Sequence, residues 1–321
     1  MNEVKAALDG TKRDLANLKE TVTTVKCASD RTSNELAVLN CTMTKLNKAN
    51  LSNLRMSCQN ETWNAGHDEC KHESRSATNF SGKSSKETPP AAKSCKELYN
   101  RNGSDGNKEY PLKLGKRIHP VYCHMTALNG CGGGGWTLVM KMDCSKNTFH
   151  YNQLIWSNKL KYNPFSGKTG FDRRETMLPT YWETEFTRIC LGMKNGKEIN
   201  FIAINITASS LFSLIADGKY HPTSLGRDKW KSLLRSNASL QSNCTREGFN
   251  AFCAGGAFKS RARIGIIASQ ENHRHSCDSR IGFGTGGHRG HSNACGIMAL
   301  GKSAEDDGHK NIKTMGFILV Q

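Results

Sequence analysis

Histidines and cysteines are concentrated near the end of the chain, where they have the chemistry to hold a metal ion. Five histidines fall in the same region as two cysteines: His273, His275, His288, His291, His309, Cys277 and Cys295. Imidazole and thiolate ligands suit zinc or copper better than calcium. The spacing matches no zinc finger, so we interpret these histidines as polar residues of surface loops rather than as a structural zinc site.

The usual catalytic motifs are absent from the sequence. There is no Gly-X-Ser-X-Gly nucleophile motif and no His-Glu-X-X-His metallohydrolase motif. The glycine run 132–135 is not followed by the Lys-Ser/Thr of a phosphate-binding loop, and it leads instead into Trp136 and an apolar strand. We therefore predict a protein that binds rather than one that catalyses.

Cysteine usage and glycosylation signals indicate secretion. The chain contains 13 cysteines, which is heavy use for a cytosolic protein, where thiols stay reduced. Asn-X-Ser/Thr acceptor sites occur at Asn40, Asn50, Asn60, Asn79, Asn102, Asn205, Asn237 and Asn243. We expect a secreted, extracellular glycoprotein with no membrane span. Residues 1–25 contain no apolar run like a signal peptide, so we also expect that an upstream signal peptide or anchor is missing from this chain.

A formal net charge of +17 suits anionic partners. Such partners include sulfated or sialylated glycans, acidic microbial polymers, anionic lipid and nucleic acid. Nucleic acid is not expected, because no reader motif accompanies the charge. The alternative is a merely soluble basic surface, since charge alone names no ligand.

Residues 1–55 are predicted to form a coiled-coil stalk. Steps of four and three residues from Val4 to Asn53 follow a continuous heptad register, which winds helices into a left-handed supercoil. A helix of this length has no core of its own, so we expect a homo-oligomer, with a trimer favoured. Cys27 and Cys41 fall on the outward f position. Three alternatives stay open: they join stalks laterally, they pair with Cys58 and Cys70, or the heptad register slips near Ser29.

The remaining chain divides into a linker and a domain. Residues 56–93 are rich in Ser, Asn, Lys and Gly, lack hydrophobic periodicity, and are predicted to be a flexible glycosylated linker. Residues 94–321 show short apolar runs between turn residues, which is typical of a mixed α+β domain with an antiparallel sheet and long loops. Strands are expected at 136–142, 201–206, 262–267 and 316–320. A short helix is expected near 226–235, capped by Thr223 or Ser224, with Trp230, Leu233 and Leu234 on its core side.

Three motifs in this domain resemble fibrinogen C-terminal-like domains. They are Ser94-Cys95, Val121-Tyr-Cys-His-Met125 and Gly134-Gly-Trp-Thr-Leu-Val139, followed by a compatible segment between Cys277 and Cys295. The stretches Leu178–Trp182, Ile189–Met193, Ser213–Gly218 and Cys277–Gly287 are similar to a variant common in cnidarians, between ficolin-like and intelectin-like sequences. The resemblance covers residues 94–321. A coiled coil followed by such a domain is also the organisation of ficolin-like lectins.

The resemblance implies disulfide bonds Cys95–Cys123 and Cys277–Cys295. The pairing of the other domain cysteines cannot be deduced from the sequence: Cys131, Cys144, Cys190, Cys244 and Cys253. Their odd number leaves one thiol over, which either joins another chain or stays buried and inert.

The resemblance also implies a calcium site just before Cys277. Ficolin-like domains carry an aspartate-rich loop there, whereas this chain has Glu271, Asn272 and Asp278 as its hard oxygen ligands. Calcium requires six to eight oxygens, so Asp306 and Asp307 are expected to contribute.

Four residues are predicted to contact a glycan. Asn272 and His273 lie in the loop beside the expected calcium site. Tyr162 and Phe165, in the loop before Gly167, are expected to be exposed and to stack on sugar rings. Four other aromatic residues are assigned to the core: Tyr122, Trp156, Tyr181 and Trp182.

Two functions fit these features. The first is a multivalent lectin, in which the stalk clusters domains that bind glycans weakly and so raises their avidity. The second is a structural matrix or adhesion protein that holds acidic polymers by charge, so that its binding responds to salt and not to sugar type.

The calcium assignment leads to a test at Asp278. Replacing Asp278 by Ala removes a charged ligand and is expected to weaken calcium binding, measured by isothermal titration calorimetry. Unchanged affinity would remove Asp278 from the ligand set.

Overall fold

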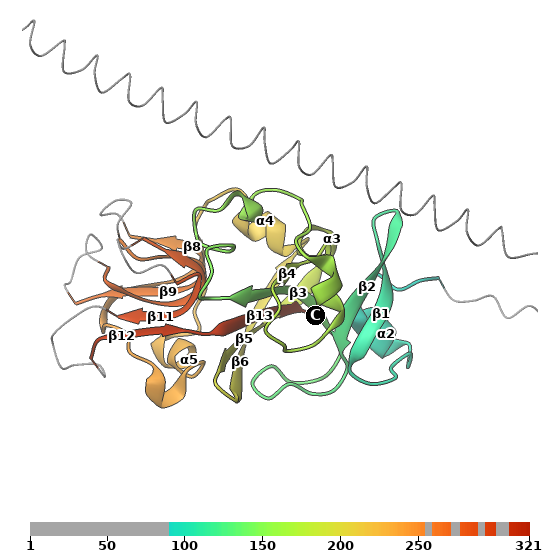
Figure 1. Ribbon diagram of the computed structural model, residues 1–321, viewed down its shortest axis with the longest axis horizontal. Coiled ribbons are helices and arrows are strands. Elements are labelled where there is room, and N and C mark those ends of the chain that lie inside the picture. The colour runs from blue at the N-terminus through green and yellow to red at the C-terminus, as the bar shows by residue number, and fades with distance from the viewer. Residues whose placement is uncertain (1–89, 254–258, 271–276, 288–292, 300–307) are drawn as a thin grey trace, which may run out of the picture. The chain divides into compact units, whose positions relative to one another are not determined.

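Antiparallel strands dominate the part of the chain that the structure describes (Figure 1). The computed structural model describes residues 90–321 apart from 254–258, 271–276, 288–292 and 300–307. The predicted stalk 1–55 and nearly all of the linker 56–93 lie outside these residues. The chain divides into Met1–Ser84 and Ser85–Gln321, and every described residue belongs to the second unit.

The first sheet has seven strands. Its main path runs β1-β2-β3-β13-β5-β6, and the short β4 pairs with β3 beside that path. The bounds are β1 Lys108–Leu114, β2 Arg117–His124, β3 Trp136–Asp143, β4 Thr176–Met177, β5 Phe186–Asn195, β6 Glu198–Ala208 and β13 Met315–Val320. The terminal strand β13 is buried along its whole length between β3 and β5, as expected for its unbroken apolar sequence.

The second sheet has six strands in the order β12-β11-β10-β9-β8-β7. The bounds are β7 His221–Pro222, β8 Asn243–Phe252, β9 Arg261–Ser269, β10 Ser279–Gly286, β11 Cys295–Ala299 and β12 Lys310–Lys313. One apolar core continues from the first sheet to this one, because Leu191 and Ile318 belong to the same buried cluster as Ile264 and Ile281. The four predicted strands are all present, as β3, β6, β9 and β13.

The described helices are short. They are α2 Cys95–Asn100, α3 Thr180–Glu183, α4 Leu211–Ile215 and α5 Arg227–Lys231, with 3-10 turns η1 Leu154–Trp156, η2 Pro164–Lys168 and η3 Arg235–Asn237. The helix expected at 226–235 is the shorter α5, which ends at Lys231. Trp230, Leu233 and Leu234 are buried as predicted, but the two leucines lie in the turn after the helix. Its cap is Gly226 rather than Thr223 or Ser224. None of the helices in the described ranges has the length and apolar character needed to cross a membrane.

Among the residues that the structure describes, four disulfide bonds join the elements. They are Cys95–Cys123, Cys131–Cys190, Cys144–Cys295 and Cys253–Cys277. The first is the bond that the resemblance implied. Cys144–Cys295 connects the chain just after β3 of the first sheet to β11 of the second, with Cα atoms 4.7 Å apart.

The implied Cys277–Cys295 bond is wrong. In the ladder of β10 and β11, Cys295 lies opposite Phe283, six residues beyond Cys277. At about 3.4 Å per residue, this register separates the two cysteines by roughly 20 Å along the strand. Cys277 therefore pairs with Cys253, at the end of β8, and not with Cys295.

Removing the bond between the sheets is expected to destabilise the domain. The Cys144→Ser/Cys295→Ser variant opens a loop of sequence separation 151, and chain entropy predicts a loss of up to about 5 kcal/mol in the free energy of unfolding. Cys253→Ser/Cys277→Ser is the matched comparison, with separation 24 and an expected loss of about 3.5 kcal/mol at most. Urea unfolding measures both. A Cys277–Cys295 peptide in a non-reducing digest would contradict the assignment.

Candidate functional site

A row of three residues forms the base of a pocket where the first sheet ends. Met315, the first residue of β13, lies opposite Asp143 of β3 on one side and Lys194 of β5 on the other. Residues directly opposite one another in neighbouring strands project from the same face of a sheet. Met315 is buried, so the row places one carboxylate and one ammonium on either side of an apolar floor.

Two chain connections build the walls of the pocket. The hairpin between β5 and β6 turns at Gly196 and Lys197, and Gly196 supplies the left-handed backbone (φ +61°) that this tight turn requires. Lys313 and Thr314 connect β12 of the second sheet to β13 of the first. The Thr314 carbonyl accepts a hydrogen bond from the backbone N–H of Cys144 at 3.0 Å, which fixes this crossing.

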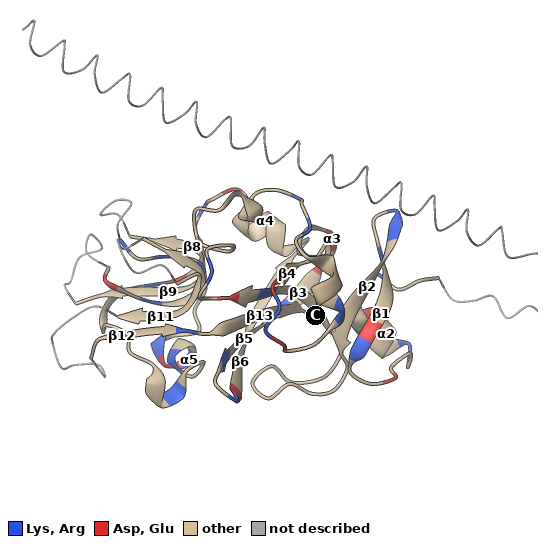
Figure 2. Cartoon of the chain, viewed as in Figure 1, with Lys and Arg blue, Asp and Glu red and all other residues tan. Residues whose placement is uncertain are grey.

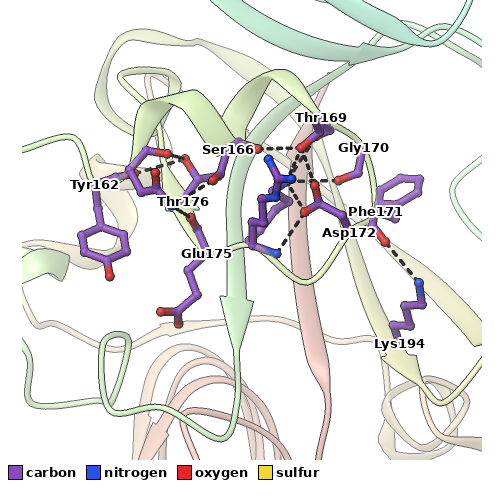
Figure 3. Close-up of polar contacts among 12 residues, drawn as sticks. Tyr162, Ser166, Thr169, Gly170, Phe171, Asp172, Glu175, Thr176 and Lys194 are labelled. Atoms are coloured by element: carbon purple, nitrogen blue, oxygen red, sulfur yellow. Dashed lines mark hydrogen bonds and ion pairs between the residues drawn. The ribbon is translucent and has the colours of Figure 1, made fainter.

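The loop that carries Arg173 is held by two lysines from the sheet. Lys141 Nζ of β3 donates to the hydroxyl of Thr169 at 3.0 Å and to Asp172 Oδ1 at 2.6 Å, and it lies 3.3 Å from the carbonyl oxygens of Thr169 and Gly170. Lys194 Nζ donates to the Phe171 carbonyl at 3.2 Å (Figure 3). Arg173 therefore projects from a loop that is fixed on both sides.

The two members of the Lys141–Asp172 pair both have lowered pKa values. Lys141 is fully buried, and this burial lowers its pKa, although the bond to Asp172 acts in the opposite direction. Burial alone would raise the pKa of Asp172, but hydrogen bonds from Lys141 and Thr169 outweigh it and leave the pKa below its ordinary value. Near neutral pH, Asp172 is thus a carboxylate that neutralises the buried ammonium.

We call the space above this row the basic pocket. It has a volume of about 260 Å³ and is lined by Asp143, Ser145, Arg173, Lys194, Asn195, Gly196, Lys313, Thr314 and Met315. Three of these residues are cationic, and Asp143 is the one carboxylate among them. Asp143 already accepts bonds from the backbone N–H and hydroxyl of Ser145 and lies 3.5 Å from Lys146 Nζ.

The charge balance of the basic pocket suits an anion. Burial opposes ionisation of Asp143, but the bonds from Ser145 and the charge of Lys146 lower its pKa, so it is ionised and occupied by its own partners. Arg173 and Lys313 are exposed and available to a ligand. Arginine binds carboxylates, sulfates and phosphates with paired hydrogen bonds, whereas lysine acts as a point charge. The volume is below the range of roughly 300–1,000 Å³ for pockets that enclose a drug-sized ligand, so the basic pocket suits one charged group or sugar ring at a time.

A second pocket has balanced charges. It has a volume of about 430 Å³ and is lined by Lys93, Ser94, Lys113, Gly115, Glu183, Thr184 and Glu185. Two lysines there face two glutamates, which leaves no net charge to attract an anion. The basic pocket is therefore the stronger candidate site.

The predicted ligand and metal residues are not brought together by the described part of the chain. Phe165 is 78% exposed and Tyr162 is 39% exposed, as expected for residues available to a ligand, and their contact with sugar stays a prediction. Asp278 lies 3.6 Å from Lys259 Nζ. The other predicted residues lie outside the described ranges: Glu271, Asn272, His273, Asp306 and Asp307. Within those ranges, no three His, Cys, Asp or Glu residues could hold a metal ion, so the described residues alone do not form the predicted calcium site.

Four of the predicted glycosylation sites can be located. Asn102, Asn205 and Asn237 are exposed. Asn243 is half-buried, and its amide donates a hydrogen bond to the Gln270 carbonyl at 2.6 Å. Asn40, Asn50, Asn60 and Asn79 lie outside the described residues. Occupancy by glycans stays a prediction at all eight.

The residues of the basic pocket were missed by the sequence analysis. Arg173, Lys194 and Lys313 belong to no sequence motif, and they are brought together by the strand order and by the loop that Lys141 and Lys194 hold. The only signal was the net charge of +17, which gives no position. Lys and Arg residues occur over both sheets (Figure 2), so charge density alone does not mark the pocket either.

Replacing Lys141 by Met is expected to loosen the loop that carries Arg173. The variant removes the bonds to Asp172 and Thr169, and we expect a loss of about 1–3 kcal/mol in the free energy of unfolding at neutral pH. Because the folded-state pKa of Asp172 is lowered, its stabilising contribution is present above about pH 4 and is lost as the pH falls through the folded value. The difference in the free energy of unfolding between the unsubstituted protein and Lys141→Met should therefore become smaller in acid. Lys219→Met, at an exposed lysine, is the control; a loss of stability in Lys141→Met that persists at low pH would contradict the ion-pair explanation.

Comparisons with known proteins leave the family open. No family model and no curated protein matches the sequence. Among solved structures, the chain is similar to a lamprey fibrin D-dimer complexed with the peptide ligand Gly-His-Arg-Pro-amide, at 17% sequence identity and a TM-score of 0.25. The match covers 60% of this chain and 53% of that chain, so it spans about half of the lamprey protein. Similarity at this level assigns neither a family nor a ligand.

Proposed function

We propose that this chain is a secreted recognition protein of fibrinogen C-terminal-like type, which binds anionic glycans and does not catalyse a reaction. The ligand is a glycan with a carboxylate or sulfate group, and the basic pocket receives that group. The predicted stalk assembles several copies, with a trimer favoured. One observation supports the proposal most directly: three cationic side chains surround a pocket whose single carboxylate is already paired.

The roles within the pocket differ. Arg173 is suited to pair with two oxygens of the anion, because its guanidinium presents a planar set of donors. Lys313 supplies a second charge from the other sheet. Lys194 positions the loop through the Phe171 carbonyl and adds a third positive charge to the same wall.

Single-site binding of this kind is weak. Ion pairs between exposed groups contribute about 0–1 kcal/mol each and are screened by salt. Joining several domains on one stalk turns the second and later contacts into intramolecular events and raises the overall affinity. An open basic pocket and an oligomeric stalk are therefore complementary features of a lectin-like protein.

The second candidate is a matrix or adhesion protein that holds acidic polymers by charge alone. A net charge of +17, with Lys and Arg over both sheets, favours this alternative (Figure 2). It requires no defined pocket, so removing any two lysines or arginines should weaken binding equally. Calcium, and sugar contacts at Asn272, His273, Tyr162 and Phe165, belong to the proposal as further expectations.

The experiment compares two doubly substituted proteins on a glycan array. Arg173→Ser/Lys313→Ser removes two charges from the basic pocket and is expected to weaken binding to sulfated or sialylated glycans about tenfold or more. Lys219→Ser/Lys229→Ser removes two exposed lysines elsewhere and changes the net charge by the same amount.

The proposal requires that Arg173→Ser/Lys313→Ser loses binding to sulfated or sialylated glycans while Lys219→Ser/Lys229→Ser keeps it. Equal loss in both variants, with binding to every polyanion fading as salt is raised, would replace it with the matrix alternative. Adding a chelator in parallel tests calcium: loss of sugar selectivity would support a metal site, and unchanged binding would remove calcium from the proposal.

A further inference from the structure

Exposed apolar side chains are concentrated in one short segment of the domain. Leu154, Leu160 and Phe165 are 77%, 67% and 78% exposed, the highest values for large apolar residues in the described ranges. We call residues 154–165 the apolar segment. Isolated exposed apolar residues are ordinary, but a concentration of them marks a contact surface for a partner or a membrane.

The apolar segment is anchored to the domain, so the exposure of its three side chains is a feature of the fold. Trp156 is fully buried, and its indole donates a hydrogen bond to the His150 carbonyl at 3.2 Å. The rings of Trp156 and Tyr162 both pack against Phe149, at centroid distances of 6.1 Å and 5.9 Å. The segment thus uses these two aromatic residues for attachment and leaves Leu154, Leu160 and Phe165 in solvent.

Positive charge accompanies the apolar residues. No Asp or Glu occurs between Cys144 and Phe171 in the sequence. Lys159 and Lys161, on either side of Leu160, are exposed, and Lys159 Nζ lies 5.2 Å from the ring centroid of Phe212. Lys168 lies 5.6 Å from the Phe165 ring and 3.6 Å from Glu109, so it is partly neutralised.

The hairpin of β1 and β2 lies close enough to the apolar segment for their charges to interact. Burial lowers the pKa of His119, and the charges of Lys161 and Arg117 lower it further. The charge of Glu183 raises the pKa of His119, and Glu183 also lines the second pocket together with two lysines.

We propose that the apolar segment is a peripheral membrane contact for anionic phospholipid surfaces. Leu154, Leu160 and Phe165 enter the boundary between headgroups and acyl chains, while Lys159 and Lys161 remain at the level of the lipid phosphates. This pairing of exposed apolar residues with basic ones is the pattern of proteins that lie on, rather than span, a membrane. The contact is separate from the basic pocket and does not depend on glycan binding.

A lipid surface fits these residues better than a protein partner does. A protein-binding site usually has few charged residues at its centre, and lysine is depleted there. Here exposed lysines flank the central leucine on both sides, an arrangement that favours anionic headgroups around an inserted apolar residue.

The test is sedimentation of the full chain with vesicles of phosphatidylcholine alone or mixed with phosphatidylserine, without any glycan. Leu154→Ser/Leu160→Ser is expected to weaken binding to the mixed vesicles about tenfold or more, because both side chains lose their apolar insertion. Lys159→Ser/Lys161→Ser is expected to weaken it roughly 25-fold, since each lysine near an anionic surface contributes about a factor of five. The control is Lys219→Ser/Lys229→Ser, with the same change in net charge.

Binding to mixed but not to neutral vesicles, lost in the two segment variants and kept in the control, is the expected result. Three results would overturn the proposal: no binding to mixed vesicles, unchanged binding of the Leu154/Leu160 variant, or equal loss in the lysine control. Absence of binding to mixed vesicles would favour a protein partner for the apolar segment instead. The variants keep Arg173 and Lys313, so glycan binding by the same proteins separates a failure here from a failure of the proposed function.

Discussion

The crossing between the two sheets is the constraint on which the candidate site depends. The chain passes from β12 to β13 through Thr314, whose carbonyl accepts the Cys144 N–H, while Cys144 is bonded covalently to Cys295 of β11. The Cys144 carbonyl in turn accepts the N–H of Ala294. These contacts fix the end of β3 against the second sheet. Asp143, Ser145 and Lys313, which line the basic pocket, are all within two residues of this crossing.

Two lysines of the first sheet show how one residue type serves opposite purposes. Lys141 is buried, and its ammonium is satisfied by two carbonyls, a hydroxyl and the Asp172 carboxylate, so it stabilises a loop and offers nothing to a ligand. Lys194 uses one hydrogen bond to hold the same loop and remains partly exposed in the pocket wall. Burial and the number of hydrogen-bond partners, not residue identity, distinguish the buried structural lysine from the one that lines the pocket.

Local signals predicted the elements well and their assembly poorly. The apolar run after Gly135 and the terminal run before Gln321 predicted β3 and β13, and the spacing of Trp230 and Leu233 predicted the buried side chains of α5 and of the turn that follows it. The prediction of a Cys277–Cys295 bond was wrong because the register of β10 and β11 is a long-range property, which the spacing of two cysteines does not reveal. The residues of the basic pocket were not predicted, for the same reason. Arg173, Lys194 and Lys313 come together only when β13 lies between β3 and β5.

In the proposed function, Arg173, Lys194 and Lys313 together receive the anionic group of a glycan. Lysine acetylation footprinting of the full chain, with and without a sulfated oligosaccharide, tests this claim at the level of single residues. The claim predicts that Lys194 and Lys313 are protected by the ligand while Lys219 and Lys229 stay reactive. Uniform protection of exposed lysines, or protection that leaves Lys194 and Lys313 unchanged, would contradict it.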